Sequence, residues 1–213
     1  MSNLAALEQL MATRRSVRKF TAELPSEAML RRLVAAASAA PSASNKQPWR
    51  FFVVQQRACI DAMAQAVREA VDEVAAHVLP ESEAAFRGYG DYFTRFVEAP
   101  AVIVPICRGH TVLSQLCDRG LAADARERIA AMERDSALVS TALAVQNLLL
   151  TAHAMGLGAS VMTGPLLASH SLRDILTVPS SWAIVALIPV GFADEAPPPT
   201  ERKSVDTIVR WMR

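Results

Sequence analysis

Several residue types are scarce in this chain of 213 residues, and each scarcity excludes a class of protein. The three cysteines, Cys59, Cys107 and Cys117, are widely spaced without a CxxC pair, which indicates neither a disulfide framework nor a zinc site. With only 8 Gly against 38 Ala, a collagen-like chain is excluded. Charged residues make up 20% and hydrophobic residues 52%, so the chain is not disordered and can bury a substantial core.

An excess of charge of either sign is also missing. The 22 basic and 21 acidic side chains leave a formal net charge of +1, so the electrostatic pattern of a dedicated nucleic-acid-binding protein is absent. The basic set contains 19 Arg and 3 Lys. This bias reflects either coding preference or a set of arginines that converge on one anion, because a guanidinium fork suits phosphate better than an ammonium does.

Targeting and membrane-spanning signals are not evident. The N-terminal segment MSNLAALEQLMATRRS has its first positive charges after its apolar positions, the reverse of a secretory signal peptide. Apolar stretches such as residues 182–193, which contain Pro189 and Gly191, fall short of the roughly 20 residues needed to cross a bilayer. We therefore expect a soluble, cytoplasmic protein without a membrane partner.

Common catalytic signatures are missing too. The histidines have no HxxxH or HxH spacing, which predicts that no metal is bound, and no serine has a GxSxG setting. A serine hydrolase is therefore disfavoured.

Periodicity predicts a single domain over residues 1–213 with helices on both sides of a few strands. The absence of a regular βαβ repeat favours an α+β fold. Helices are expected near residues 4–11, 26–40, 57–77, after 80, 136–155 and at the C-terminus, and strands at 49–56, 101–107, 158–162 and 182–190. Residues 109–135 are polar and rich in charge with weak periodicity, and we expect them to form a surface excursion or a short helix. The nearly uncharged helix at 136–155 predicts burial on almost all sides, in a core or a subunit interface.

A basic cluster follows the first helix, in the sequence RRSVRKF. In an extended chain Arg14, Ser16 and Arg18 share one face, which would form a phosphate cradle. A solvated basic turn explains the same residues, and spacing does not decide between the two.

Two further segments have the composition of ligand-binding loops. Between Pro41 and Trp49 the sequence PSASNKQPW offers hydroxyl and amide groups suited to a polar heterocycle, although an ordinary turn uses the same residues. Thr163 and Gly164 follow a predicted strand, where glycine allows backbone N–H groups to approach a flat ligand.

Four segments in order resemble the FMN-dependent nitroreductase-like family: RRSVRKF, AAASAAPSASNKQPWRFFVV, AVQNLLLTAHAMGLGASV and LIPVGFADEAPPPTERKSVDTIVRW. The resemblance covers nearly the whole chain except about residues 57–135. It implies an α+β fold with a central, mostly antiparallel sheet and an intertwined homodimer with two FMN sites at its interface. It also implies a variable, substrate-shaping region at about residues 80–135.

The same resemblance assigns the cofactor-binding residues. Arg14 with Arg202 would hold the FMN phosphate, and Arg18 would reach the N1/O2 edge of the flavin. The remaining matches are Arg15 and Ser16 in the first motif, the partner-contributed loop of Pro41, Ser42, Ala43 and Asn45, and Thr163 and Gly164 near flavin N5. Arg18 and Thr163 would tune the flavin electronically.

Two departures from the better-known nitroreductases stand out. Their Asn and nearby Lys after the first strand have no equivalent here, where Met63 and Gln65 occur without a lysine. Thr200 occupies a position at which some members carry a second phosphate-binding cation.

The implied activity is NADPH- or NADH-driven, ping-pong reduction of an electron-poor acceptor such as a nitroaromatic or quinone. The alternatives are a non-catalytic flavin-binding protein and a specialised reaction, such as dehalogenation, flavin fragmentation or dehydrogenation. A DNA-binding regulator that uses RRSVRK is disfavoured by the net charge.

Overall fold

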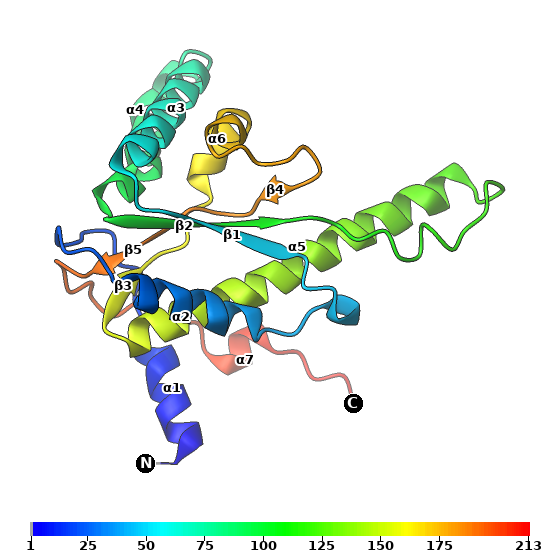
Figure 1. Ribbon diagram of the computed structural model, residues 1–213, viewed down its shortest axis with the longest axis horizontal. Helices are drawn as coiled ribbons and strands as arrows, with labels where there is room; N and C mark the ends of the chain where they lie inside the picture. The colour runs from blue at the N-terminus through cyan, green and yellow to red at the C-terminus, as the bar shows by residue number, and fades with distance from the viewer. Residues whose placement is uncertain (1) are drawn as a thin grey trace.

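The computed structural model describes residues 2–213 and contains a five-stranded sheet between two layers of helices (Figure 1). The strand order is β1-β2-β5-β3, with β4 paired to the end of β2, and the named pairs are all antiparallel. The strands are β1 (Trp49–Val54), β2 (Ala101–Cys107), β3 (Leu157–Ala159), β4 (Ala183–Ile184) and β5 (Ile188–Phe192). This arrangement confirms the α+β fold with an antiparallel sheet.

The central strand β2 divides the core into two clusters because its side chains alternate between the sheet faces. Val102, Val104 and Ile106 pack on one face, and Ala101 and Ile103 pack on the other. The first cluster includes α3 (Arg57–Ala75), α4 (Glu83–Phe93) and α6 (Ser169–Ile175), and the second includes α2 (Glu27–Ser38) and α5 (Ala123–Ala154) (Figure 1). β2 is buried along its whole length, as expected for a strand covered on both sides.

Most element positions agree with the sequence predictions. The first helix, α1 (Asn3–Thr13), and α2, which Ser26 caps by accepting from the Met29 N–H, lie where the apolar spacing indicates. The predicted strand at 182–190 is two strands, β4 and β5, and the C-terminal helix α7 (Val205–Ile208) is only one turn long. The remaining elements are the short helices η1 (Ala43–Asn45), η2 (Pro80–Ser82), η3 (Arg95–Glu98) and η4 (Gly164–Ala168).

The start of α5 corrects the prediction for residues 109–135. The helix begins at Ala123, so the charged segment before Ser136 is its first half rather than a separate short helix. With 32 residues it is about 48 Å long at 1.5 Å per residue. The first half contains the ion pair between Asp124 and Arg128, spaced i,i+4, which is compatible with a solvent-facing helix.

Within one chain the second half of α5 is buried on one side only, so the expected burial in a core is confirmed for that side, and burial of the other side in a subunit interface stays a prediction. Ala144, Leu148 and Ala152 are fully buried against the sheet and α2, whereas Val139 and Leu143 are 59% and 44% exposed. The helix is long and apolar enough to cross a membrane by length and composition, which the sequence analysis did not anticipate. Its packing against the sheet identifies it as the core helix of the fold.

The loop that precedes α5 is held by one carboxylate. Glu133 Oε1 accepts the backbone N–H groups of Val112 (2.6 Å), Leu113 (2.8 Å) and Ser114 (3.3 Å). Its Oε2 accepts the Ser114 hydroxyl at 2.9 Å. Burial alone raises the pKa of Glu133, and the hydrogen bonds from Val112, Ser114 and Leu113 outweigh this effect, so the pKa is lowered.

A Glu133→Gln substitution is expected to destabilise the protein at neutral pH. Because the folded-state pKa is lowered, the carboxylate stabilises the fold above the unfolded pKa of about 4.3 and loses this contribution as pH falls through the folded value. The difference in urea midpoint between wild type and Glu133→Gln should therefore be largest at pH 6–7 and shrink below about pH 4. A difference that stays constant across this range would contradict the assigned role.

Candidate functional site

The segment after α1 lies against the edge strand β3. Ser16 forms a parallel bridge with Ala159, and the Val17 N–H donates to the Ala159 carbonyl at 3.2 Å. A Cβ on Gly158 would lie only 2.6 Å from Val17 Cγ1, so this approach requires glycine. The segment is therefore an extended chain on the sheet edge, the first of the two alternatives that the spacing left open, and its role as a phosphate cradle stays a prediction.

Arg14 and Arg202 come together at the start of this segment, although 188 positions separate them. Burial, followed by the charges of Arg202 and Arg15, lowers the pKa of Arg14. No carboxylate in residues 2–213 forms an ion pair with Arg14 or Arg202. Like charges that converge without an acidic partner are stabilised by a bound anion.

The Arg15 side chain, unlike that of Arg14, bonds to the end of α1. Its Nη1 donates to the carbonyls of Ala12 at 2.6 Å and Arg14 at 2.8 Å, which lie at the C-terminal end of α1. Cations at this end of a helix satisfy carbonyls that lack a helical partner. Arg15 thus has a structural role, and its contact with a cofactor stays a prediction.

Arg18 is held through its backbone by a carboxylate that the sequence analysis missed. Glu195 Oε1 accepts the N–H groups of Arg18 at 2.6 Å and Lys19 at 3.2 Å. Arg18 Nη1 also donates to the Ser16 carbonyl at 3.2 Å. Glu195 lies in an acidic, proline-rich tail, and nothing in that pattern distinguishes it from a solvent-exposed glutamate.

The C-terminal end of α4 lies beside Arg18 and Gly164. The ring centre of Tyr92 is 4.1 Å from the Arg95 guanidinium carbon and 5.5 Å from that of Arg18, both within the range of cation–π attraction. A Cβ on Gly164 would overlap the ring of Phe93. The aromatic region at residues 89–93 therefore contacts two of the predicted site segments.

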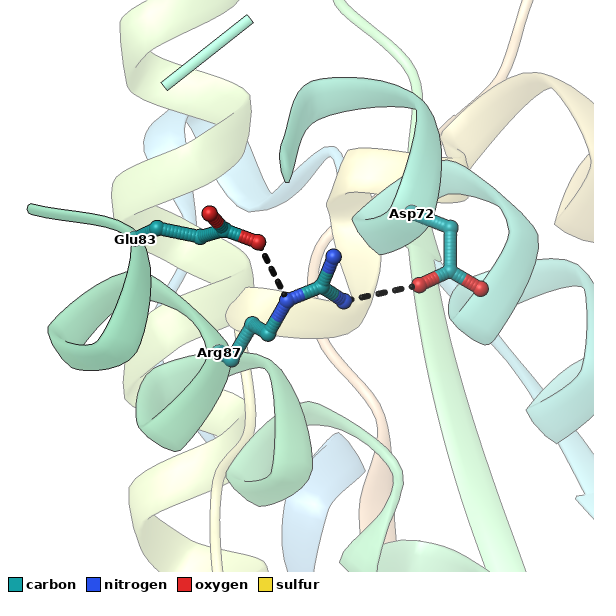
Figure 2. Close-up of polar contacts among 3 residues, drawn as sticks. All are labelled: Asp72, Glu83 and Arg87. Carbon is teal, nitrogen blue, oxygen red and sulfur yellow. Dashed lines mark hydrogen bonds and ion pairs between the residues drawn. The ribbon is translucent and has the colours of Figure 1, made fainter. Parts of the chain in front are cut away.

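An ion-pair bridge on the opposite end of α4 joins it to α3 (Figure 2). Arg87 Nε is 3.0 Å from Glu83 Oε1, and its Nη1 is 3.3 Å from Asp72 Oδ1 on α3. These side chains are 47–72% exposed, so the bridge between α3 and α4 contributes little stability.

Thr163 and Gly164 follow β3, at the start of the short helix η4. Met162 and Leu187 bond each other's backbone groups at 2.9 Å, which fixes the chain just before Thr163. Ser160, one residue after β3, has a fully buried hydroxyl without a hydrogen-bond partner among the described residues. Buried hydroxyl groups nearly always have a hydrogen-bond partner, so Ser160 is a candidate site residue, and the sequence contained no signal for it.

The loop with Pro41, Ser42, Ala43 and Asn45 forms a second group. The Ala43 N–H donates to Ser140 Oγ at 3.3 Å, which attaches the loop to α5. Pro41, Ser42 and Ala43 line, with the exposed apolar face of α5, a cavity of about 670 Å³. Non-glycine residues with positive φ, including Asn45 at 52°, are concentrated here, and such strain is typical of binding sites.

The structure does not bring the two groups together within one chain. Thr13 Oγ1, just before the RRSVR segment, is 2.8 Å from His153 Nε2 on α5. The loop contacts α5 at Ser140 instead. The 13 residues between these contacts correspond to about 20 Å along the helix axis.

The comparisons with known proteins identify the class. The Nitroreductase family model matches residues 11–192, so the chain belongs to the nitroreductase family. This membership confirms the resemblance inferred from the four sequence segments.

Individual relatives agree with this membership. A protein named NADH dehydrogenase from Thermus thermophilus is 32% identical over 200 residues, which cover 93% of this chain and 92% of the relative. A BluB-like flavoprotein from Clostridium difficile has a TM-score of 0.84 at 22% identity, with coverage of 97% and 99%. A nitroreductase with bound FMN from Desulfitobacterium hafniense has a TM-score of 0.74 at 21% identity and covers both chains fully.

Gly164→Ala tests the contact between α4 and the segment after β3. The added methyl overlaps Phe93, so we expect a loss of about 1–3 kcal/mol in the free energy of unfolding. In a Phe93→Leu background Gly164→Ala should lower the free energy of unfolding by less, because the leucine side chain that the added methyl group meets is smaller. A double-mutant cycle by urea denaturation measures this coupling, and an equal cost in both backgrounds would contradict the contact.

Proposed function

We propose that this protein is an FMN-dependent oxidoreductase that works as a homodimer. It would take reducing equivalents from NADH or NADPH and deliver them to an electron-poor acceptor such as a nitroaromatic or quinone. The observation that carries the proposal is the pair of arginines, Arg14 and Arg202, that converge without an acidic partner beside the edge of the sheet. Family membership and an FMN-containing neighbour of the same fold support it.

The residues around β3 fit FMN. Arg14 and Arg202 would hold the phosphate by charge-assisted hydrogen bonds, and the backbone that Gly158 allows to lie close would form the wall beside it. The unpartnered Ser160 hydroxyl would gain a partner from the cofactor. When bound, FMN supplies hydride acceptance from the nicotinamide and electron delivery to the acceptor, so no side-chain nucleophile is needed.

Arg18 is proposed to carry the main electrostatic role. A guanidinium directed at the N1/O2 edge would stabilise negative charge that develops on reduction. Glu195 fixes the backbone at this residue, and Tyr92 contacts the guanidinium, so the cation is held in place before any ligand arrives. Thr163 and Gly164 would present a hydrogen-bond donor to N5.

The homodimer proposal rests on the separation of the two groups of residues. Pro41, Ser42, Ala43 and Asn45 lie about 20 Å along α5 from the start of the RRSVR segment. A second copy of the chain would bring its loop to the flavin of the first. The exposed apolar face of α5, with Val139 and Leu143, would be covered at the same time.

Arg14→Gln tests the phosphate cradle without reference to turnover. Loss of one charge-assisted contact of about 1.5–3 kcal/mol should raise the FMN dissociation constant about tenfold to a hundredfold, measured by quenching of FMN fluorescence. Arg31→Gln is the control, because Arg31 is an exposed residue of α2 that pairs only with Glu27. Equal FMN affinity in wild type and Arg14→Gln would contradict the cradle.

Arg18→Ala separates the electrostatic role from binding. The variant should retain FMN, but reduction by NADH or NADPH in stopped-flow absorbance should slow by about tenfold or more. Reduction at the wild-type rate would refute the role of Arg18. If wild-type protein binds FMN and neither nucleotide reduces it, the protein is a non-catalytic flavin carrier instead.

A further inference from the structure

A basic cavity adjoins the loop at residues 41–47, and none of the residues assigned to FMN lines it. It has a volume of about 790 Å³, within the range of ligand-binding pockets. Three cations, Lys46, Arg108 and Arg134, line it. They come from three separate places in the chain: the loop before β1, the end of β2 and the first half of α5.

Two further groups extend the cluster. Burial, and then the charges of Arg108, Lys46 and Arg50, lower the pKa of His110, which places these cations around one imidazole. The guanidinium carbons of Arg50 and Arg108 are 5.4 Å and 5.3 Å from the ring centre of Trp182. The aromatic ring thus holds two arginines in defined positions by cation–π attraction.

The cluster has no acidic counterpart. Over residues 2–213, none of Lys46, Arg50, Arg108 or Arg134 takes part in an ion pair. Glu133 is the one acidic residue in the lining, and its two carboxylate oxygens accept four hydrogen bonds from the loop at residues 112–114. Glu133 therefore fixes the loop that forms one wall of the cavity, and its oxygens already accept hydrogen bonds there. The three cations that line the cavity have no ion-pair partner among the described residues.

The position of the cavity relates it to the proposed flavin site. Lys46 follows Asn45 directly, and a neighbouring cavity of about 250 Å³ shares Lys46 and His110 and is lined by Ala43 and Ser44. The basic cavity therefore begins where the loop proposed to meet the partner subunit's flavin ends. A ligand that reaches from the flavin along this loop would bring its far end to the cations.

We propose that this cavity binds the phosphomonoester of a nucleotide reductant, the 2′-phosphate of NADPH, and so makes NADPH the preferred electron donor. The inference rests on the proposed oxidoreductase function. NADPH differs from NADH by this one phosphate group, which carries close to two negative charges at neutral pH. Arginine forks bind such groups in bidentate geometry, and Arg108 and Arg134 supply two of them.

The direct test is calorimetric titration of FMN-saturated protein with adenosine 2′,5′-bisphosphate and with adenosine 5′-monophosphate. Saturation with FMN blocks the phosphate cradle at Arg14, so that only a second site responds. The bisphosphate should bind at least about tenfold more tightly, which corresponds to about 1.4 kcal/mol. Arg108→Gln and Arg134→Gln should each lose this preference, and Arg31→Gln should keep it.

Steady-state kinetics give the second measurement. The ratio of kcat/KM with NADPH to kcat/KM with NADH should exceed one in wild type and fall in both cavity variants. Inorganic phosphate should compete with NADPH more strongly than with NADH. If phosphate instead competes with an anionic acceptor and leaves the donor ratio unchanged, the cavity binds the acceptor and the donor assignment is overturned.

The role of the basic cavity and the oxidoreductase function can be refuted independently. Equal affinity for both adenosine nucleotides, in a protein that reduces acceptors, overturns the cavity assignment and leaves the oxidoreductase function intact. If the bisphosphate binds more tightly but neither NADPH nor NADH reduces the bound FMN, the phosphate-binding role of the cavity is supported and the oxidoreductase function is refuted.

Discussion

The close contact between the segment after α1 and the edge strand β3 organises the rest of the molecule. It depends on Gly158, which leaves room for Val17, and on the backbone hydrogen bond that the Val17 N–H donates to the Ala159 carbonyl. Once the segment is held there, Arg14 meets Arg202 at one end and Arg18 meets Tyr92 at the other. A short stretch of extended chain thereby connects the N-terminus, the C-terminal tail and α4.

Much of this arrangement follows from local sequence patterns. The apolar spacing of α2 and the β-branched run of β2 each agree with the element they form, because burial of one face or of both dictates those patterns. α1 also forms where its apolar spacing predicts a helix, although none of its residues is buried within this chain. The start of α5 does not follow in this way. Its first half is charged on most sides, so periodicity is weak there even though the helix continues from Ala123.

The candidate site residues that stand in the family-like segments, Arg202 included, could be named from the sequence, and those that act only through contacts across the fold could not. Arg14, Arg18 and Gly164 stand in recognisable segments, whereas Glu195 and Ser160 acquire meaning only through contacts across the fold. The orientation of Arg15 toward the end of α1 depends equally on three-dimensional geometry. The basic cavity joins Lys46, Arg108 and Arg134, which are too far apart in sequence to form a motif.

The central claim is that each flavin site combines the RRSVR segment of one chain with the loop at residues 41–45 of its partner. Subunit complementation tests it most directly. A heterodimer is prepared from one chain with Arg14→Gln and Arg18→Ala and another with Ser42→Ala and Asn45→Ala, and FMN binding is titrated. The account predicts about one high-affinity FMN per dimer, because one site then collects both defects and the other has none. Absence of any wild-type-like site would contradict the account.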